Sequence, residues 1–282
     1  MKNILVSTDF SNNAYNALFF ATQLFEKRSC NFYLINTYTE LTPLITQKIG
    51  AEGRQSLMAQ LSDESAEGLS QVYHRIHLDR DNPLHHFKTI SKNDHLIDGL
   101  NQAVDTYDID LLVMGNKGQT SAKNILWGSR VSKAIDEVFN CPILIVPREI
   151  EYAMPKEIAF ATDYIHVYNA KVLHPLVQLA SLCEANIRIL HINEEDRLSD
   201  DQKSNLYTLR EYLGNLEHSL HWMPDFASKS HVIQTFLDEL GIDMLVMLRY
   251  EHGFISSLIR EPVLRKMSFN INIPLLVLPY NT

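Results

Sequence analysis

Apolar residues along the chain fall into two alternating patterns. Stretches that are apolar at nearly every position are typical of strands covered on both faces of a sheet. They lie at residues 2–7, 32–37, 109–114 and 142–147, with a weaker strand expected near 87–91. Between them, apolar residues recur at spacings of three and four, which predicts helices within residues 14–25, 57–76 and 96–107. This alternation predicts an α/β fold with a doubly wound parallel sheet.

The pattern of the first half returns in the second half. Four strand-like blocks recur in the same order: Lys2–Asp9 as Lys156–Asp163, Asn31–Asn36 as Asn186–His191, Ile109–Met114 as Ile242–Met247, and Cys141–Pro147 as Ile273–Pro279. Such an ordered recurrence predicts a tandem duplication. A charged stretch between Pro147 and Pro155 suits a linker, so we expect two tandem domains, 1–150 and 151–282, each with a five-stranded parallel sheet.

A glycine pattern follows the strand predicted at 109–114. Gly115 and Gly118 are followed, after nine intervening residues, by Gly128-Ser129, giving Gly-x2-Gly-x9-Gly-Ser. Glycine lets a ligand approach the backbone closely, and a helix N-terminus favours anions, so the pattern predicts a phosphate cradle to which Lys117 adds a cation. A plain glycine turn before an N-capped helix explains the same spacing. Neither the P-loop pattern nor the dinucleotide-binding Gly-x-Gly-x2-Gly pattern occurs, which excludes those two classes.

Three features together resemble the universal stress protein family. They are Thr8-Asp9 after the first strand, the glycine pattern after the fourth, and Cys141–Pro147 closing the half. The resemblance covers both halves and implies a tandem protein of two adenine nucleotide alpha hydrolase-like domains. In the nucleotide-binding branch of the family this glycine pattern holds the phosphates of ATP. The resemblance therefore implies ATP, or else ADP or AMP, as the ligand, with Mg²⁺ as an optional companion.

The resemblance also implies roles for individual residues. Asp9 and the backbone near Thr37 would face adenine and ribose, Met114 and Gly115 would line the ribose, and the glycine pattern would hold phosphate. The expected site residues are Thr8, Asp9, Thr37, Met114, Gly115, Gly118, Gly128 and Ser129. From the residues alone, Asp9 and Ser129 are also good helix caps. The segment from Ser129 to Cys141 is one residue longer than the family pattern, so Ser132 is left out of the predicted site.

The second half keeps Thr162-Asp163 but loses the glycines. Leu248 stands opposite Gly115, Glu251 opposite Gly118, and Arg260–Pro262 opposite Gly128-Ser129. A carboxylate repels phosphate, and proline lacks the backbone N–H group that a cradle needs. We therefore expect ATP to bind in the first domain only.

Composition narrows the function classes. The chain has 282 residues, 45% of them hydrophobic and 21% charged, as in ordinary globular proteins, and its net charge of -9 disfavours nucleic acid or an anionic membrane as partner. Three scattered cysteines predict reduced core thiols, and the histidine pairs lack further ligands at metal-binding spacing. The polar N-terminus lacks the apolar stretch of a signal peptide, and no apolar run is long enough to span a bilayer, so we expect a cytoplasmic protein.

The leading hypothesis is a stress-response regulatory protein that binds an adenine nucleotide and reports its presence to an unknown protein partner. We find no nucleophile set in a catalytic turn, and so expect no enzyme in the ordinary sense. Two alternatives stay open: a nucleotide-free interaction or scaffold protein, and a slow ATPase. The two halves are expected to pair antiparallel through their last strands as an intrachain pseudo-dimer, unless each edge pairs with another chain to give a homodimer.

Overall fold

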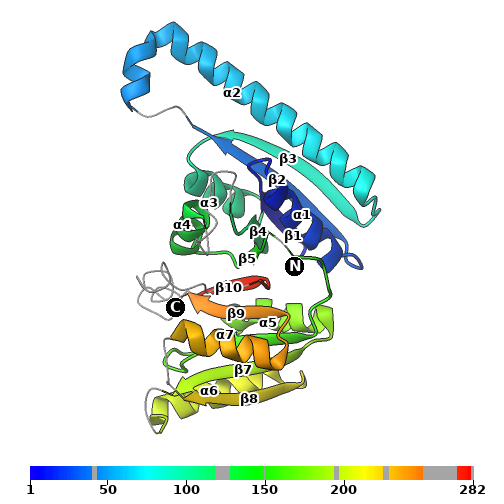
Figure 1. The fold of residues 1–282 in the computed structure, drawn as a ribbon, viewed down its shortest axis with the longest axis vertical. Coiled ribbons are helices and arrows are strands. Elements are labelled where there is room, and N and C mark those ends of the chain that lie inside the picture. The colour runs from blue at the N-terminus through cyan, green and yellow to red at the C-terminus, as the bar shows by residue number, and fades with distance from the viewer. Residues whose placement is uncertain are drawn as a thin grey trace.

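A computed structural model describes residues 1–39, 43–117, 128–148, 150–193, 197–224, 229–249 and 272–280. Strands and helices alternate along the chain, and the strands form one ten-stranded sheet (Figure 1). The first half contains β1 (Asn3–Ser7), α1 (Asn12–Leu24), β2 (Cys30–Tyr38), α2 (Pro43–Asp79), β3 (His85–Asn93), α3 (Leu96–Thr106), β4 (Leu111–Gly115), α4 (Ser129–Glu137) and β5 (Ile143–Val146). The second contains β6 (Glu157–Ala161), α5 (Ala170–Cys183), β7 (Asn186–Asn193), α6 (Asp200–Leu213), β8 (His218–Pro224), α7 (Lys229–Leu240), β9 (Met244–Arg249) and β10 (Leu275–Pro279).

The predicted α/β fold is confirmed, with two differences in length. The weak strand expected at 87–91 is a full strand, β3, and the helix expected at 57–76 is the C-terminal part of the longer α2. The additional N-terminal turns of α2 extend past the strands that the helix covers (Figure 1). These turns contain Gly50 and Gly53 and lack a regular apolar spacing. The apolar pattern therefore marked only the part of the helix that packs on the sheet.

The strand order is β3-β2-β1-β4-β5-β10-β9-β6-β7-β8. Within each half every pair of neighbouring strands is parallel. At the centre, β5 and β10 pair antiparallel, with Leu144 opposite Leu276, which confirms the predicted pairing of the two last strands. In the first half the order reverses between β1 and β4, and ligands of doubly wound sheets bind at the carboxyl ends of strands at such a point.

The hydrophobic core lies in two layers, one on each face of the sheet. Side chains from α1, α2, α5 and α6 fill one layer, and side chains from α3, α4 and α7 fill the other. Each layer contains residues of both halves, and Leu144 and Leu276 are fully buried at the junction. Cys30, Cys141 and Cys183 are buried and unpaired, as expected for core thiols. The core is therefore continuous across the two halves.

The same hydrogen bonds secure the start of the central strand in each half. The Asp110 carboxylate accepts from the backbone N–H groups of Lys2 and Asn3 at 2.6 and 2.9 Å. The Asp243 carboxylate accepts from the N–H groups at positions 156 and 157 at 2.7 and 2.9 Å. Equivalent aspartates thus satisfy donors that the sheet leaves unpaired.

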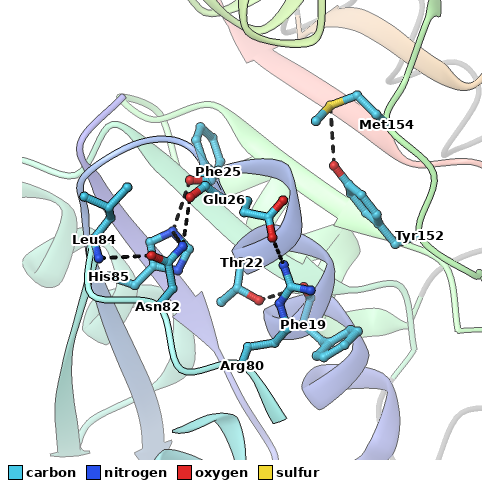
Figure 2. A network of polar contacts seen from close by, with 10 residues as sticks. All are labelled: Phe19, Thr22, Phe25, Glu26, Arg80, Asn82, Leu84, His85, Tyr152 and Met154. Atoms are coloured by element: carbon cyan, nitrogen blue, oxygen red, sulfur yellow. Dashed lines mark hydrogen bonds and ion pairs between the residues drawn. The ribbon is translucent and has the colours of Figure 1, made fainter.

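A polar network connects the end of α1 to the turn before β3 (Figure 2). Figure 2 shows His85 with Nε2 directed at the Phe25 carbonyl oxygen, 3.1 Å away, and Asn82 donating to the Glu26 carbonyl oxygen at 2.8 Å. The His85 ring is 6% exposed and packs edge-on against Phe32. Its Nδ1 is buried and has no hydrogen-bond partner among the described residues. Burial lowers the pKa of His85 below its ordinary value.

Replacing His85 by glutamine is expected to flatten the pH dependence of stability, because the glutamine amide can donate to the Phe25 carbonyl without titrating. Below about pH 6.5 the unfolded chain binds a proton at His85 that the folded protein resists, so the wild type loses stability as the pH falls. Urea unfolding at about pH 7.5 and about pH 5.5 should show that the free energy of unfolding falls more in the wild type than in the variant when the pH is lowered. The exposed His174, replaced the same way, is the control. If the stability of the wild type and of His85→Gln changed equally with pH, His85 would not contribute to the pH dependence of stability.

Truncating the chain after residue 150 is expected to expose β5 as an open apolar edge and to make the fragment associate. Light scattering during gel filtration at several concentrations measures this association, and circular dichroism confirms that the fragment is folded. In the full chain β10 covers the same edge. A folded fragment that stays monomeric at high concentration would contradict the role given to the β5–β10 pair.

Candidate functional site

A cavity of about 310 Å³ opens at the carboxyl ends of β1, β2 and β4. Most of the residues predicted for the site line it: Thr8, Asp9, Thr37, Met114, Gly115, Gly128 and Ser129. Gly118 lies outside the described residues. The predicted residues are thus brought together from segments more than a hundred positions apart in the sequence.

Thr8 fixes the path of the chain as it leaves β1. Its N–H group donates to the Ile35 carbonyl oxygen at 2.9 Å, its own carbonyl oxygen accepts from Asn36 Nδ2 at 2.8 Å, and its hydroxyl oxygen accepts from the Phe10 N–H group at 3.0 Å. Phe10 has a φ of 63°, a left-handed conformation that costs energy for a residue with a side chain. The hydroxyl of Thr8 therefore supports a strained turn beside the cavity.

Asp9 presents its carboxylate to the cavity wall. Oδ1 accepts from the Ser11 N–H group at 3.1 Å, and Oδ2 lies 3.8 Å from Nη1 of Arg130. The N-cap of α1 is Ser11, whose hydroxyl accepts from the Ala14 N–H group. The alternative in which Asp9 itself caps α1 is therefore wrong. The cap must be the residue next to the first helical turn, and Asp9 lies two positions earlier.

Gly115 is required by the close approach of α1. A Cβ atom at this position would lie 2.6 Å from Asn13 Nδ2 and 2.9 Å from the Asn13 backbone oxygen. Asn13 in turn donates to the Lys117 carbonyl oxygen at 2.6 Å and to Asn116 Oδ1 at 3.2 Å. The glycine and the asparagine together hold the exit of β4 against α1. At the equivalent position of β9, Leu248 is buried.

The N-terminus of α4 forms the opposite wall of the cavity. Its N-cap is Gly128, not Ser129 as the sequence allowed, because the Gly128 backbone is extended while Ser129 is already helical. The Gly128 N–H group donates to the Asn116 carbonyl oxygen at 2.9 Å, which joins the two ends of the segment 118–127. The first N–H groups of a helix have no intrahelical partner. Residues 129–131 therefore offer donors at an end of the helix that favours anions.

Two cations also line the cavity: Lys117, which is expected beside the phosphates, and Arg130, which was not predicted. Lys117 follows the exit of β4, and Arg130 lies in the first turn of α4. Lys117 lies within the glycine pattern, between Gly115 and Gly118, and Arg130 directly follows it, so basic residues within and beside the pattern were the available signal. Asn36 and Leu96 were missed as well. Asn36 lies next to the predicted Thr37 near the end of β2, whereas nothing in a single sequence shows that the start of α3 faces the same cavity.

The profile of the universal stress protein family matches residues 1–147. The chain belongs to the universal stress protein family. No curated protein matches it significantly. In the part of the chain that the structure describes, no helix is long and apolar enough to cross a membrane, and no group of three or more histidine, cysteine or acidic side chains is placed to hold a metal ion.

Solved structures with the same fold extend over nearly the whole chain. A universal stress protein from Archaeoglobus fulgidus DSM 4304 is 14% identical, with a TM-score of 0.66 over 98% of this chain and 95% of that one. A functionally unknown protein from Pseudomonas aeruginosa PAO1 is 12% identical, with a TM-score of 0.57 over 99% and 92%. The cytoplasmic domain of a prokaryotic cation chloride cotransporter is 9% identical, with a TM-score of 0.54 over 99% and 95%. At these identities the likeness establishes the fold alone.

Replacing Gly115 by alanine is expected to destabilise the protein by about 1–3 kcal/mol, the usual cost of overpacking. The new methyl group would contact both the amide and the backbone of Asn13. Urea unfolding of Gly115→Ala, Asn13→Ala and the double variant measures the effect. The double variant should recover part of the cost, since the amide is then gone and only the backbone contact remains. Strict additivity of the two single effects would rule out the proposed contact.

Proposed function

We propose that the first half binds an adenine nucleotide in the cavity between β1, β4 and α4, with ATP as the first candidate and ADP or AMP as alternatives. The observation that supports this proposal is the junction of the cavity with the N-terminus of α4. At this place the first N–H groups of α4 lie together with the side chains of Lys117 and Arg130. These groups make the local environment positive, which favours the binding of a polyphosphate. Family membership supports a regulatory role in stress responses.

The residues that line the cavity suggest a division of roles. Asp9, Thr37 and Met114 would contact the nucleoside, and the α4 N-terminus would hold the phosphates. Asp9 is the only carboxylate lining this cavity among the described residues. A Mg²⁺ ion that accompanied the nucleotide would therefore take most of its oxygen ligands from phosphates and water, as this ion commonly does.

The proposed role is binding without rapid catalysis. A general base would have to be within reach of the attacking water. The only carboxylate at the described wall is Asp9, which already accepts from the Ser11 N–H group and faces Arg130. Slow ATP hydrolysis and a nucleotide-free scaffold role are the competing functions, and the binding and turnover measurements described below distinguish them.

We also propose the division into domains 1–150 and 151–282, with the second domain unable to bind the nucleotide. The buried Leu248 stands where the first domain has Gly115. Glu251 and Arg260–Pro262, which correspond in the sequence to Gly118 and to Gly128-Ser129, lie outside the described residues. This proposal implies one bound nucleotide per chain.

Titration calorimetry is expected to give about one ATP per chain, and Ser129→Glu should weaken ATP binding at least about tenfold while changing adenosine binding little. The added carboxylate would repel phosphate at the helix N-terminus. Ser132→Glu, on the same helix but outside the cavity lining, is the matched control. Two nucleotides per chain, or equal effects of both substitutions, would contradict the assignment. No binding at all would favour the scaffold role, and turnover above about 1 s⁻¹ would favour an enzyme.

A further inference from the structure

The C-terminal turn of α4 is capped from the second half of the chain. Arg249, the last residue of β9, donates through Nη1 to the carbonyl oxygens of Ile135, Asp136 and Val138, at 2.9, 3.3 and 3.2 Å. The last carbonyl groups of a helix have no partner inside the helix. Arg249 therefore supplies the donor that α4 lacks at this end.

The remaining carbonyl group in this turn is satisfied from the first half. Asn101, on α3, donates to the Glu137 carbonyl oxygen at 3.1 Å. Every carbonyl group from 135 to 138 thus receives a side-chain hydrogen bond. Three of these come from one guanidinium group that belongs to the other side of the β5–β10 junction.

Burial strengthens the Arg249 contact. The residue is 9% exposed, and its guanidinium carbon lies 4.5 Å from the centre of the Phe139 ring. A cation next to the negative end of a helix is stabilising, and more so where water is excluded. Hydrogen bonds from a charged donor are also stronger than those from a neutral one such as Asn101.

The other end of α4 is the positive wall of the cavity. The helix spans only nine residues, and a helix of this length is not stable in water by itself. The orientation of its first N–H groups therefore depends on how the helix is held by its neighbours. Arg249 is one of the groups that hold it, and its bonds run from the second half to a helix of the first.

We propose that Arg249 is a positioning residue that couples the cavity of the first half to the second half through α4. By holding the C-terminal end of the helix, it fixes the donors at the N-terminal end in place for an anionic group. Linkage is reciprocal, so a ligand that binds at this wall must in turn strengthen the Arg249 contact. The identity of the ligand in this proposal rests on the proposed nucleotide function, whereas the contact between Arg249 and α4 does not.

The experiment compares Arg249→Met with Arg249→Lys in the full chain, with ATP and adenosine as ligands. Methionine keeps much of the side-chain volume but donates no hydrogen bond. We expect Arg249→Met to weaken ATP binding about tenfold, the order of a partly buried cation at a helix end, and adenosine binding much less. Lysine should restore part of the ATP affinity, because it keeps the charge and can donate to the same carbonyl groups.

Arg188→Met is the matched control. Arg188 pairs with Glu157 and donates to Ser219, all within the second half. Its loss should lower stability without changing the ratio of ATP to adenosine affinity. An unchanged ratio in Arg249→Met, or an equal change in Arg188→Met, would overturn the proposal, because a merely structural role alters both ligands together.

Amide hydrogen exchange provides a readout without nucleotide. Peptides that cover α4 should exchange faster in Arg249→Met than in the wild type or in Arg188→Met. Unchanged α4 exchange would overturn the coupling even if affinity fell. If the wild type bound neither ligand, the proposed nucleotide function would fail, and the exchange measurement alone would decide whether Arg249 holds α4.

Discussion

The antiparallel pairing of β5 with β10 is the interaction on which the rest of the structure depends. Each strand ends a half-sheet and is almost wholly apolar, so leaving either open would expose both side chains and unpaired backbone groups. Pairing Leu144 opposite Leu276 buries both and makes one continuous core on each face of the sheet. It also brings the end of β9 next to α4, which is why Arg249 can reach a helix of the other half.

Among the described residues, the two halves share their framework and differ at the end of the strand that faces the cavity in the first half. Asp110 and Asp243 make the same hydrogen bonds at the strand starts, and Thr8 and Thr162 accept from the N–H group two residues later in both halves. Folding itself requires these contacts, because each satisfies a backbone donor. The pairing of Gly115 with Asn13 serves only the cavity side of β4, and a leucine stands in that position of β9. This difference is what we expect if only one half retains a binding function.

The sequence predicted the strands well because a strand buried on both faces is apolar at nearly every position, as Leu111–Met114 shows. Three of the residues that the family resemblance implied, Asp9, Thr37 and Gly115, line one cavity because parallel strands end at one edge of the sheet. Helix starts were less predictable: Ser11 and Gly128 are the caps, since several neighbouring residues in each turn are good cap formers. Nothing in the sequence indicated the role of Arg249. Its partners are backbone carbonyl groups of another segment, and a residue of any type supplies such groups.

The short length of α4 gives the arrangement its functional meaning. A long helix would be stable without help at its ends, and a contact at one end would then have little influence on the other. A nine-residue helix depends on its caps, so the groups at its two ends contribute to one shared equilibrium. The cavity lies at one end and the second half of the chain at the other. Under the proposed coupling, a second half that has lost its own glycine pattern still influences how α4 presents its first N–H groups to the cavity.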